Sequence, residues 1–162
     1  MHDAGVAASG DASVELFNGS ERLTDKELTE LGRPIWEWSR YAKDTEIPKE
    51  QSILLYRTWI ENSMYNGYAN ACFVAREKNK IVGLCTINMK NRDGYIDLLG
   101  VLQEYRGKHI GSRLVESAIS YCANKVKRMF VVTEGENIPA NRLYQQKGFI
   151  IDKVELVYHK HV

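Results

Sequence analysis

A basic, glycine-rich turn carries the residue types that could hold a phosphate group. The sequence R-G-K-H-I-G-S, from Arg106 to Ser112, follows a short apolar stretch and opens a helical pattern. Backbone N–H groups at a helix start are free to bind an anion, and the helix dipole favours negative charge there. Gly107 and Gly111 let the backbone approach a ligand, while Arg106 and Lys108 add charge. This spacing predicts an anion site; a surface turn that begins a helix without any ligand is the alternative.

The elements around this turn follow from hydrophobic periodicity and turn signals. The second half of the chain is predicted to contain hairpin strands Ala71–Arg76 and Ile81–Met89, a strand Tyr95–Val101, a helix from Ile110 to Cys122, a strand Met129–Thr133, a helix Ile138–Lys147 capped by Asn137 and Gly148, and a last strand Ile150–Tyr158. The glycine-rich turn therefore joins a strand to an amphipathic helix.

The first half of the chain is predicted to be mainly helical. Its elements are a strand from Val14 to Phe17, a helix with Thr24 and Glu27 as a capping box that stops or kinks near Gly32-Arg33-Pro34, and a helix from Pro48 to Asn66-Gly67. Between the helices lies an aromatic cluster, Trp36, Trp38 and Tyr41. This cluster either packs against the sheet or forms one wall of an acceptor pocket.

The order of the elements, β-α-α-β-β-β-α-β-α-β, predicts the fold class. The strand–helix–strand unit favours a parallel pair, Tyr95–Val101 beside Met129–Thr133, and the hairpins favour antiparallel neighbours. We therefore expect an α/β fold, a single domain with a mixed sheet, a central parallel pair and helices on both faces. The domain is expected to span residues 14–162 after a flexible leader, residues 1–13.

Composition narrows the function classes. A chain of 162 residues fits one domain with one core. A net charge of +1 argues against a nucleic-acid partner, which would require a strongly basic face. No apolar run approaches the roughly 18 residues of a membrane span. Residues 1–13 lack the charged and apolar regions of a signal peptide.

The three cysteines, Cys72, Cys85 and Cys122, are isolated and fall in apolar stretches. They are best interpreted as buried free thiols, and their spacing indicates no metal site. A catalytic cysteine has no support in the surrounding residues. Free thiols indicate a reducing compartment, so we expect a cytoplasmic protein.

Two motifs in the second half resemble those of the GNAT acetyltransferase superfamily. The stretch V-L-Q-E-Y-R-G-K-H-I-G-S-R-L, from Val101 to Leu114, resembles motif A, a strand followed by R-x-x-G-x-G/A, with His109 in place of the first glycine. The stretch N-I-P-A-N-R-L-Y-Q-Q-K-G-F, from Asn137 to Phe149, resembles motif B, N-x-x-A-x-x-x-Y-x-x-x-G-F. Their order and separation make the joint signal stronger than either motif alone. The resemblance covers about Cys72 to Tyr158 and implies the GNAT fold, in which the two parallel strands splay apart.

This resemblance implies acetyl-CoA as acyl donor and no metal. In the family the motif A turn binds the CoA pyrophosphate, and the pantetheine pairs with the strand before it. The implied contacts are Leu99, Gly100, Val101, Arg106, Gly107, Lys108, His109, Ile110, Gly111, Ser112, Asn137, Ala140 and Tyr144. Gly100 would leave room for the thioester. The alternative is that Gly100 marks a β-bulge and contacts no ligand. We expect His109 to be tolerated because its position can be helical, whereas a positive φ there would strain it.

Acyl transfer also needs groups that move protons. Tyr144 stands at the motif B tyrosine, which the family often uses as general acid toward the CoA sulfur; a packing role is the alternative. Asp97, before the turn, and Glu134, just past the paired strand, could each take a proton from the amine directly or through water. Both also fit ordinary polar strand ends, so the choice of base stays open.

The acceptor side resembles that of bacterial dTDP-fucosamine acetyltransferases. Both have S-R-[FY] followed by a helix with Y-x-x-W-I-E-N-[SA], here Ser39–Tyr41 and Tyr56–Ser63. Those enzymes acetylate a nucleotide-linked amino-dideoxy sugar, which implies such a small-molecule acceptor here, contacted by Arg40, Trp59 and Asn62. Another small amine, a peptide amine, or a non-catalytic acetyl-CoA-binding module are the alternatives, and the last rests on His109. A homodimer is compatible with each of them.

Overall fold

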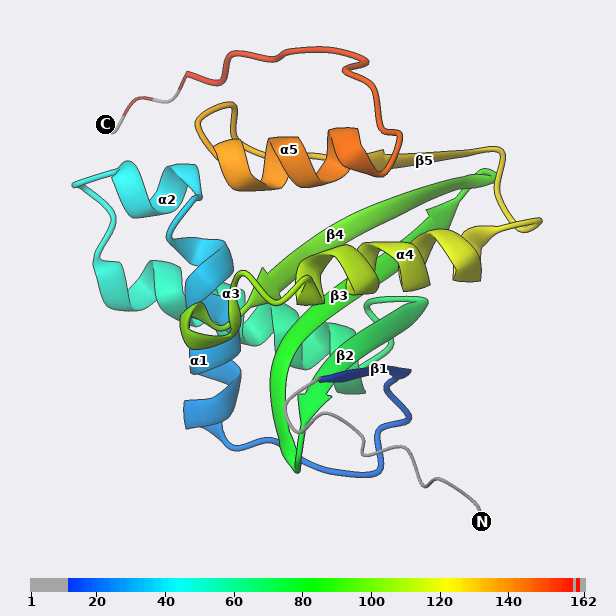
Figure 1. The fold of residues 1–162 in the computed structure, drawn as a ribbon. Helices are drawn as coiled ribbons and strands as arrows, with labels where there is room; N and C mark the ends of the chain where they lie inside the picture. Colours follow the sequence, from blue (N-terminus) through cyan, green and yellow to red (C-terminus); the bar gives the residue numbers. More distant parts are fainter. Residues whose placement is uncertain (1–11, 159, 161–162) are drawn as a thin grey trace.

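A computed structural model of the protein describes residues 12–158 and 160 (Figure 1). Its elements in chain order are β1 Ser13–Leu16, α1 Asp25–Trp36, α2 Arg40–Lys43, α3 Lys49–Tyr65, β2 Ala71–Glu77, β3 Lys80–Lys90, β4 Asp93–Val101, a 3₁₀ turn Gln103–Tyr105, α4 Ile110–Cys122, β5 Arg128–Val131 and α5 Ile138–Gln146. Most predicted elements are present with ends shifted by one or two residues. Residues 1–11 of the predicted leader lie outside the described residues, and Ala12 is buried beside β1.

The strands of the described residues form one sheet in the order β1-β2-β3-β4-β5. All neighbours are antiparallel except β4 and β5, whose partners run from Asp93↔Arg128 to Ile96↔Val131. The predicted parallel pair is therefore confirmed. The last pair of β4 and β5 is Ile96↔Val131, and β4 continues to Val101 without a partner in β5. The two strands therefore diverge at their C-terminal ends.

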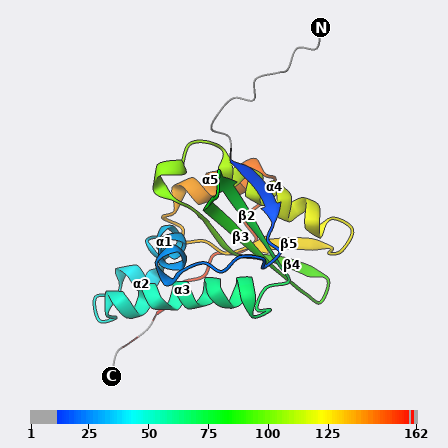
Figure 2. The ribbon, with the colours of Figure 1, turned by 90° about the horizontal axis from the view of Figure 1, so that it is seen from below.

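Helices cover both faces of the sheet, with α1, α2 and α3 on one side and α4 and α5 on the other (Figure 2). Gly94 and Gly100 show that β4 packs against helices on both faces of the sheet. A β-carbon on Gly94 would touch Cys122 of α4, whereas one on Gly100 would meet Ile35 of α1. The two glycines are six positions apart, so a regular strand would point both to one face. An extra residue in β4, Asp97, reverses the faces between them.

The predicted apolar stripe of α4 forms the core on its side of the sheet. Its buried residues are Ile110, Leu114, Val115, Ala118 and Cys122. The cysteines are free and buried, as predicted. Cys85 lies on the central strand β3, fully enclosed between the helical layers.

Of the two predicted outcomes near Gly32-Arg33-Pro34, a stop or a kink, the stop does not occur, because helix α1 continues through Pro34 to Trp36. A proline inside a helix costs about 3 kcal/mol through its lost N–H and a steric clash. Tertiary contacts offset that cost, because Trp36 is buried and its indole Nε1–H donates to Ser52 Oγ at 2.8 Å. The cost of a helix-breaking residue thus depends on what the helix packs against.

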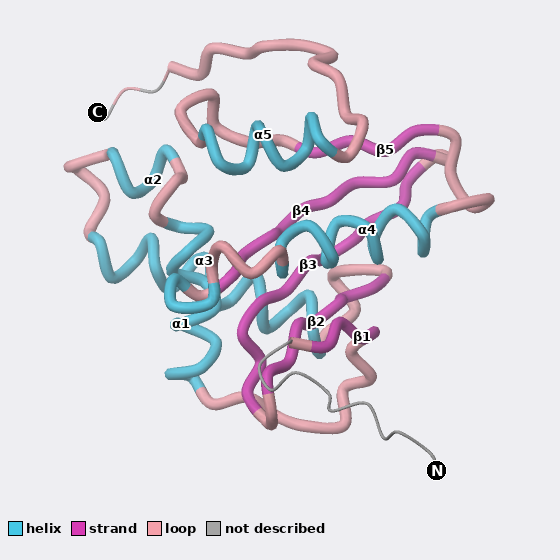
Figure 3. Tube along the Cα trace, viewed as in Figure 1, coloured by secondary structure: helices cyan, strands magenta, loops and turns pink. Residues whose placement is uncertain are grey.

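The predicted last strand, Ile150–Tyr158, is not formed. The described residues after α5 form a loop that runs apart from the sheet (Figure 3). Apolar side chains of this segment, such as Ile150 and Tyr158, are exposed. Apolar alternation forms a strand only where the segment pairs with a strand edge, and residues 150–158 pair with no strand of the described sheet. The parallel pair therefore lies at one edge of the described sheet, with β5 outermost.

Candidate active site

A cleft of about 340 Å³ lies where β4 and β5 diverge. The sheet contributes residues 96–99 of β4 and residues 131–134 at the end of β5. Helix α5 and its N-cap contribute Asn137, Ala140 and Tyr144. The helices of the other layer contribute residues 34–35 and 38–41, with Tyr56 and Trp59 of α3. The cleft thus passes between the two layers of helices through the gap in the sheet.

The cleft brings together residues that the sequence places far apart. The predicted site residues that line it are Asp97, Leu99, Glu134, Asn137, Ala140, Tyr144, Arg40 and Trp59. Asn62 is not among the lining residues: its Oδ1 accepts a hydrogen bond from Asn66 Nδ2 at 2.8 Å, and its carbonyl accepts from the Asn66 N–H. This bonding closes the end of α3, and the acceptor contact of Asn62 stays a prediction.

Gly100 lets α1 pack closely against β4. A β-carbon at this position would lie 2.8 Å from Ile35 Cγ1, far inside van der Waals contact. The alternative of a bulge at Gly100 is wrong, because Gly100 pairs in register with Leu84, and the predicted approach of a thioester to this residue stays a prediction. Val101 lies beyond the cleft lining, where its Cγ2 would touch a β-carbon on Gly111 at 3.9 Å.

The bulge of β4 lies at Asp97. Ile96 pairs with Ile87 and Leu98 pairs with Thr86, so Asp97 has no opposite residue in β3. A bulge bends a strand and redirects a side chain. Here the bulged residue, Asp97, lines the cleft. Sequence reasoning selected Asp97 but contained no signal for the bulge.

Tyr144 lines the cleft from α5 and is 7% exposed. Its ring meets Phe149 edge-on, with 5.8 Å between the centroids. Burial raises the pKa of the Tyr144 hydroxyl well above its usual value, and the Cys85 thiol adds to the shift. The hydroxyl therefore keeps its proton at neutral pH and can donate a hydrogen bond to a developing negative charge.

The acceptor-side motif folds into an aromatic wall. The rings of Tyr41 and Tyr56 meet edge-on at 6.5 Å between centroids, and Trp59 lies 6.0 Å from Tyr56. The Arg40 guanidinium lies 4.9 Å from the centre of the Tyr41 ring and donates to its hydroxyl at 3.1 Å. Tyr56 was not predicted as a contact, although the Y-x-x-W spacing, one turn of helix, places it beside Trp59.

The aromatic cluster at the end of α1 was predicted either to pack against the sheet or to form a wall of an acceptor pocket, and its members do both. Trp36 packs in the core, while Trp38 and Tyr41 line the cleft. Ser39, between Trp38 and Tyr41, is the N-cap of α2, and its Oγ accepts from the Ala42 N–H at 3.3 Å. The short helix α2 therefore carries Tyr41 at the cleft.

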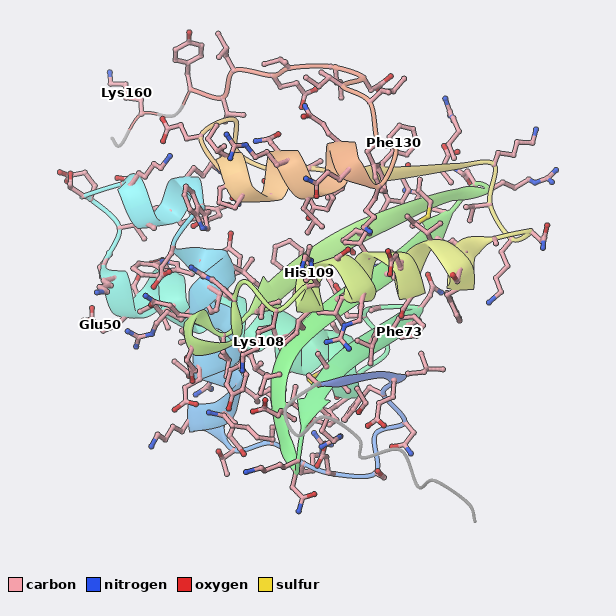
Figure 4. The ribbon with its side chains drawn as sticks, viewed as in Figure 1. Glu50, Phe73, Lys108, His109, Phe130 and Lys160 are labelled. Atoms are coloured by element: carbon pink, nitrogen blue, oxygen red, sulfur yellow. The ribbon has the colours of Figure 1, made fainter. Side chains whose placement is uncertain are left out.

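The predicted anion turn lies beyond the cleft, at the start of α4, with Lys108 and His109 projecting from it (Figure 4). His109 is the N-cap of α4 and has φ 57° and ψ 15°, a left-handed conformation, so the expectation that it is helical is wrong. That conformation costs a non-glycine residue roughly 1–3 kcal/mol, and histidine tolerates it better than most. The His109 side chain makes no capping hydrogen bond, which leaves the first-turn N–H groups to other partners.

The cations of the turn are held by weak contacts. Arg106 Nε donates to the Val101 carbonyl at 3.4 Å, and its guanidinium lies 3.9 Å from the Glu37 carboxylate. Lys108 Nζ lies 3.7 Å from the Glu77 carboxylate. Surface pairs of this kind contribute roughly 0–1 kcal/mol, so little is lost when such a cation turns to a phosphate.

The loop that carries Glu134 is fixed to α5. Asn137 caps α5 as predicted, because its Oδ1 accepts from the Ala140 N–H at 3.2 Å. The Asn141 side chain was not singled out from the sequence. Its amide donates to the carbonyls of Glu134, Gly135 and Asn137. These bonds hold Glu134 at the mouth of the parallel pair.

Comparison with protein families shows to which family this chain belongs. The model of the Acetyltransferase (GNAT) family matches residues 28–149. The chain belongs to this family. Acetyltransferases of this family use acetyl-CoA as the acyl donor. The arrangement of the GNAT motifs agrees: the motif A turn opens α4, and the motif B tyrosine reaches the cleft from α5.

The curated proteins that resemble this chain carry different functional names. The spore coat polysaccharide biosynthesis protein SpsD of Bacillus subtilis (strain 168) is 26% identical over 133 residues, which cover 82% of this chain and 46% of SpsD. N-alpha-acetyltransferase 30 of Xenopus laevis is 33% identical over 114 residues, which cover 67% of this chain and 40% of that protein. The chain spans less than half the length of these curated relatives.

A solved GNAT-like structure shares the fold. AAC(6')-Iy, solved in complex with the bisubstrate analogue CoA-S-monomethyl-acetylneamine, superposes with a TM-score of 0.57 at 15% identity, covering 94% of this chain and 100% of that one. No helix in the described part of this chain is long and apolar enough to cross a membrane. Within residues 12–158 and 160, no group of histidine, cysteine and acidic side chains could hold a metal ion.

Proposed function

We propose that this GNAT protein transfers the acetyl group of acetyl-CoA to the primary amine of a small molecule, the amino group of a nucleotide-linked amino-dideoxy sugar. The observation that carries the proposal is the convergence of Asp97, Glu134, Tyr144 and the aromatic wall on one cleft. The wall offers flat apolar surface for rings, and Arg40 offers a charge for phosphate.

The two ends of the cleft suit the two substrates. In our proposal the start of α4, with Arg106 and Lys108, holds the CoA pyrophosphate through backbone N–H groups and charge. The pantetheine reaches the gap between β4 and β5 beside Leu99, Asn137 and Ala140. The acceptor enters from the opposite layer, between α2 and α3.

Different residues of the cleft act on the acceptor amine and on the departing sulfur. Asp97 takes a proton from the acceptor amine as its nitrogen bonds to the acetyl carbon, directly or through a water molecule. We favour Asp97 over Glu134 because Asp97 lines the cleft at the bulge of β4, whereas Glu134 interacts electrostatically with Arg40. Tyr144 donates a hydrogen bond to the sulfur as the carbon–sulfur bond breaks.

A peptide amine is the second candidate acceptor. The similarity to N-alpha-acetyltransferase 30 supports it, at a higher identity than that to SpsD but over a shorter stretch. The similarity to SpsD reaches over more of the chain, and the acceptor-side motif builds the aromatic wall. These two observations lead us to prefer the sugar.

A CoA-release screen separates these acceptors. The purified chain is incubated with acetyl-CoA and nucleotide-linked amino sugars, polyamines or peptides with free N-termini. Turnover with an amino sugar nucleotide supports the proposal, and turnover confined to peptides replaces it with the second candidate. Tight acetyl-CoA binding without turnover of any amine would indicate a non-catalytic module.

Arg40 gives a sharper test of the acceptor side. Arg40→Ala should raise the KM of the acceptor about tenfold, the size of a lost hydrogen bond to a charged group, and leave the KM of acetyl-CoA within twofold. Arg142→Ala is the matched control, because Arg142 is an exposed arginine of α5 outside the cleft lining. The reverse pattern, a changed KM for acetyl-CoA alone, would contradict the division of the cleft.

A further inference from the structure

Asn88 of β3 connects the bulged Asp97 to the acceptor side of the protein, although it does not line the cleft. Its side-chain Nδ2 donates to Asp97 Oδ2 at 2.5 Å and to the Tyr68 carbonyl at 3.1 Å. A carboxamide nitrogen carries two N–H groups, so both are used. Tyr68 lies in the turn directly after α3, the helix that carries Trp59 of the aromatic wall.

The bulge explains why Asp97 needs such a partner. Its neighbours are held in register: Ile96 pairs with Ile87, and the Leu98 N–H donates to Thr86 Oγ1 at 3.1 Å. Asp97 has no opposite residue in β3 to hold it by cross-strand packing. A hydrogen bond from a neutral amide to one oxygen of a carboxylate restrains the rotation of that side chain.

We propose that Asn88 is a positioning residue for acyl transfer, which holds the Asp97 carboxylate in the orientation that takes the proton of the acceptor amine. This role rests on the proposed function. The bond engages Oδ2, and Oδ1 is the oxygen that receives the proton as the nitrogen–carbon bond forms. Through Tyr68, the same amide ties the orientation of Asp97 to the end of α3.

A second connection between the same turn and the same strand supplies a matched control. Asn70 Oδ1 accepts from the Met89 N–H at 2.7 Å, and the Asn70 N–H donates to the Ile87 carbonyl at 2.9 Å. Neither bond involves Asp97. Asn70→Ala therefore loosens the turn from β3 without changing the partner of the carboxylate.

The test is a double-mutant cycle on kcat, measured with the best amine from the CoA-release screen. Asn88→Ala should lower kcat about tenfold, as expected for a misplaced catalytic group, and leave the KM of acetyl-CoA within twofold. In the Asp97→Asn background the same substitution should change kcat less than twofold, because the group that it positions is gone. Asn70→Ala should lower the melting temperature but leave kcat within twofold.

Asn88→Asp keeps the side-chain shape, removes the donors and places a like charge beside Asp97, so it repeats the cycle if Asn88→Ala does not fold. Wild-type kcat in Asn88→Ala, or a tenfold loss that persists in the Asp97→Asn background, overturns the positioning role alone. Wild-type kcat in Asp97→Asn also overturns it. Absence of turnover by the wild-type protein with every amine instead removes the proposed function, and the positioning role with it.

Discussion

Ile35 of α1 occupies the space beside Gly100 of β4, with its Cγ1 only 2.8 Å from where a β-carbon on the glycine would lie. The same contact includes Ile35 Cδ1 at 3.1 Å and the Leu31 carbonyl at 3.4 Å. The glycine therefore lets α1 approach the strand that forms the floor of the cleft. This close approach brings the residues after α1 to the cleft mouth.

Gly100→Ala should destabilise the fold by about 1–3 kcal/mol, the usual cost of overpacking a core. Urea denaturation measures the change. Combining it with Ile35→Val, which removes the Cδ1 methyl group, should recover part of the loss because the two sites are in contact. A Gly100→Ala protein with normal stability but weakened acetyl-CoA binding would show that the glycine serves the ligand after all.

His109→Gly should raise the free energy of unfolding by about 1 kcal/mol, since glycine adopts φ 57° without strain. The affinity for acetyl-CoA should change less than tenfold, because the backbone N–H groups keep their directions. Isothermal calorimetry and denaturation measure the two quantities. Gly107→Ala is the opposite control, since it adds strain at φ 76°. A gain in affinity beyond tenfold for His109→Gly would point to a damaged pyrophosphate site and a non-catalytic module.

Arg106→Ala should weaken acetyl-CoA binding by roughly 1.5–3 kcal/mol, the range for a hydrogen bond to a charged group. Glu37→Ala is the matched control: it removes the carboxylate 3.9 Å from the Arg106 guanidinium and should leave binding unchanged or slightly tighter. Calorimetry at constant salt concentration gives both constants. Equal dissociation constants for wild type and Arg106→Ala would remove the turn from the pyrophosphate site.

Tyr144→Phe should lower kcat about a hundredfold, the low end for a general acid, and leave acetyl-CoA affinity within a few fold. The raised pKa of Tyr144 makes its hydroxyl a weak acid, so its main contribution is a hydrogen bond to the developing thiolate. The substitution keeps the ring contact with Phe149. Single-turnover kinetics isolates the chemical step. A near wild-type rate there would reduce Tyr144 to a packing residue.

The stability of the protein should fall in alkali because of its buried thiols. Burial raises the pKa of the Cys72 thiol to about 12, and also raises the pKa of Cys85. An unfolded thiol titrates near pH 8.5, so unfolding releases protons above that pH. The stabilising effect is complete below about pH 8.5 and is lost as the pH rises toward 12. Urea denaturation from pH 8 to pH 11 should show a slope that Cys72→Ala flattens by up to about 1.4 kcal/mol per pH unit. An identical slope in both proteins would contradict this.

Short-range sequence signals, such as hydrophobic periodicity and helix caps, were enough to predict the elements that bear the family motifs. The apolar stripe of α4 recurs with the helical period and is buried as predicted. The capping box of Thr24 and Glu27 is present, with the Thr24 N–H donating to Glu27 Oε2 at 2.8 Å, and Asn137 caps α5. Such signals involve residues within one turn of each other, so the sequence alone determines them.

Long-range packing decided the rest. The continuation of α1 through Pro34 depends on a hydrogen bond from Trp36 to Ser52, on another helix. The bulge at Asp97 depends on the register with β3, and apolar alternation in residues 150–158 produces no strand where the chain pairs with no strand edge. The sequence by itself therefore determined the order of the elements from β2 to α5 and the choice of catalytic candidates, because both rest on short-range patterns. Only the tertiary structure decided which of those candidates face one cleft and why Gly100 is a glycine, because strand register and helix packing depend on residues far apart in the chain.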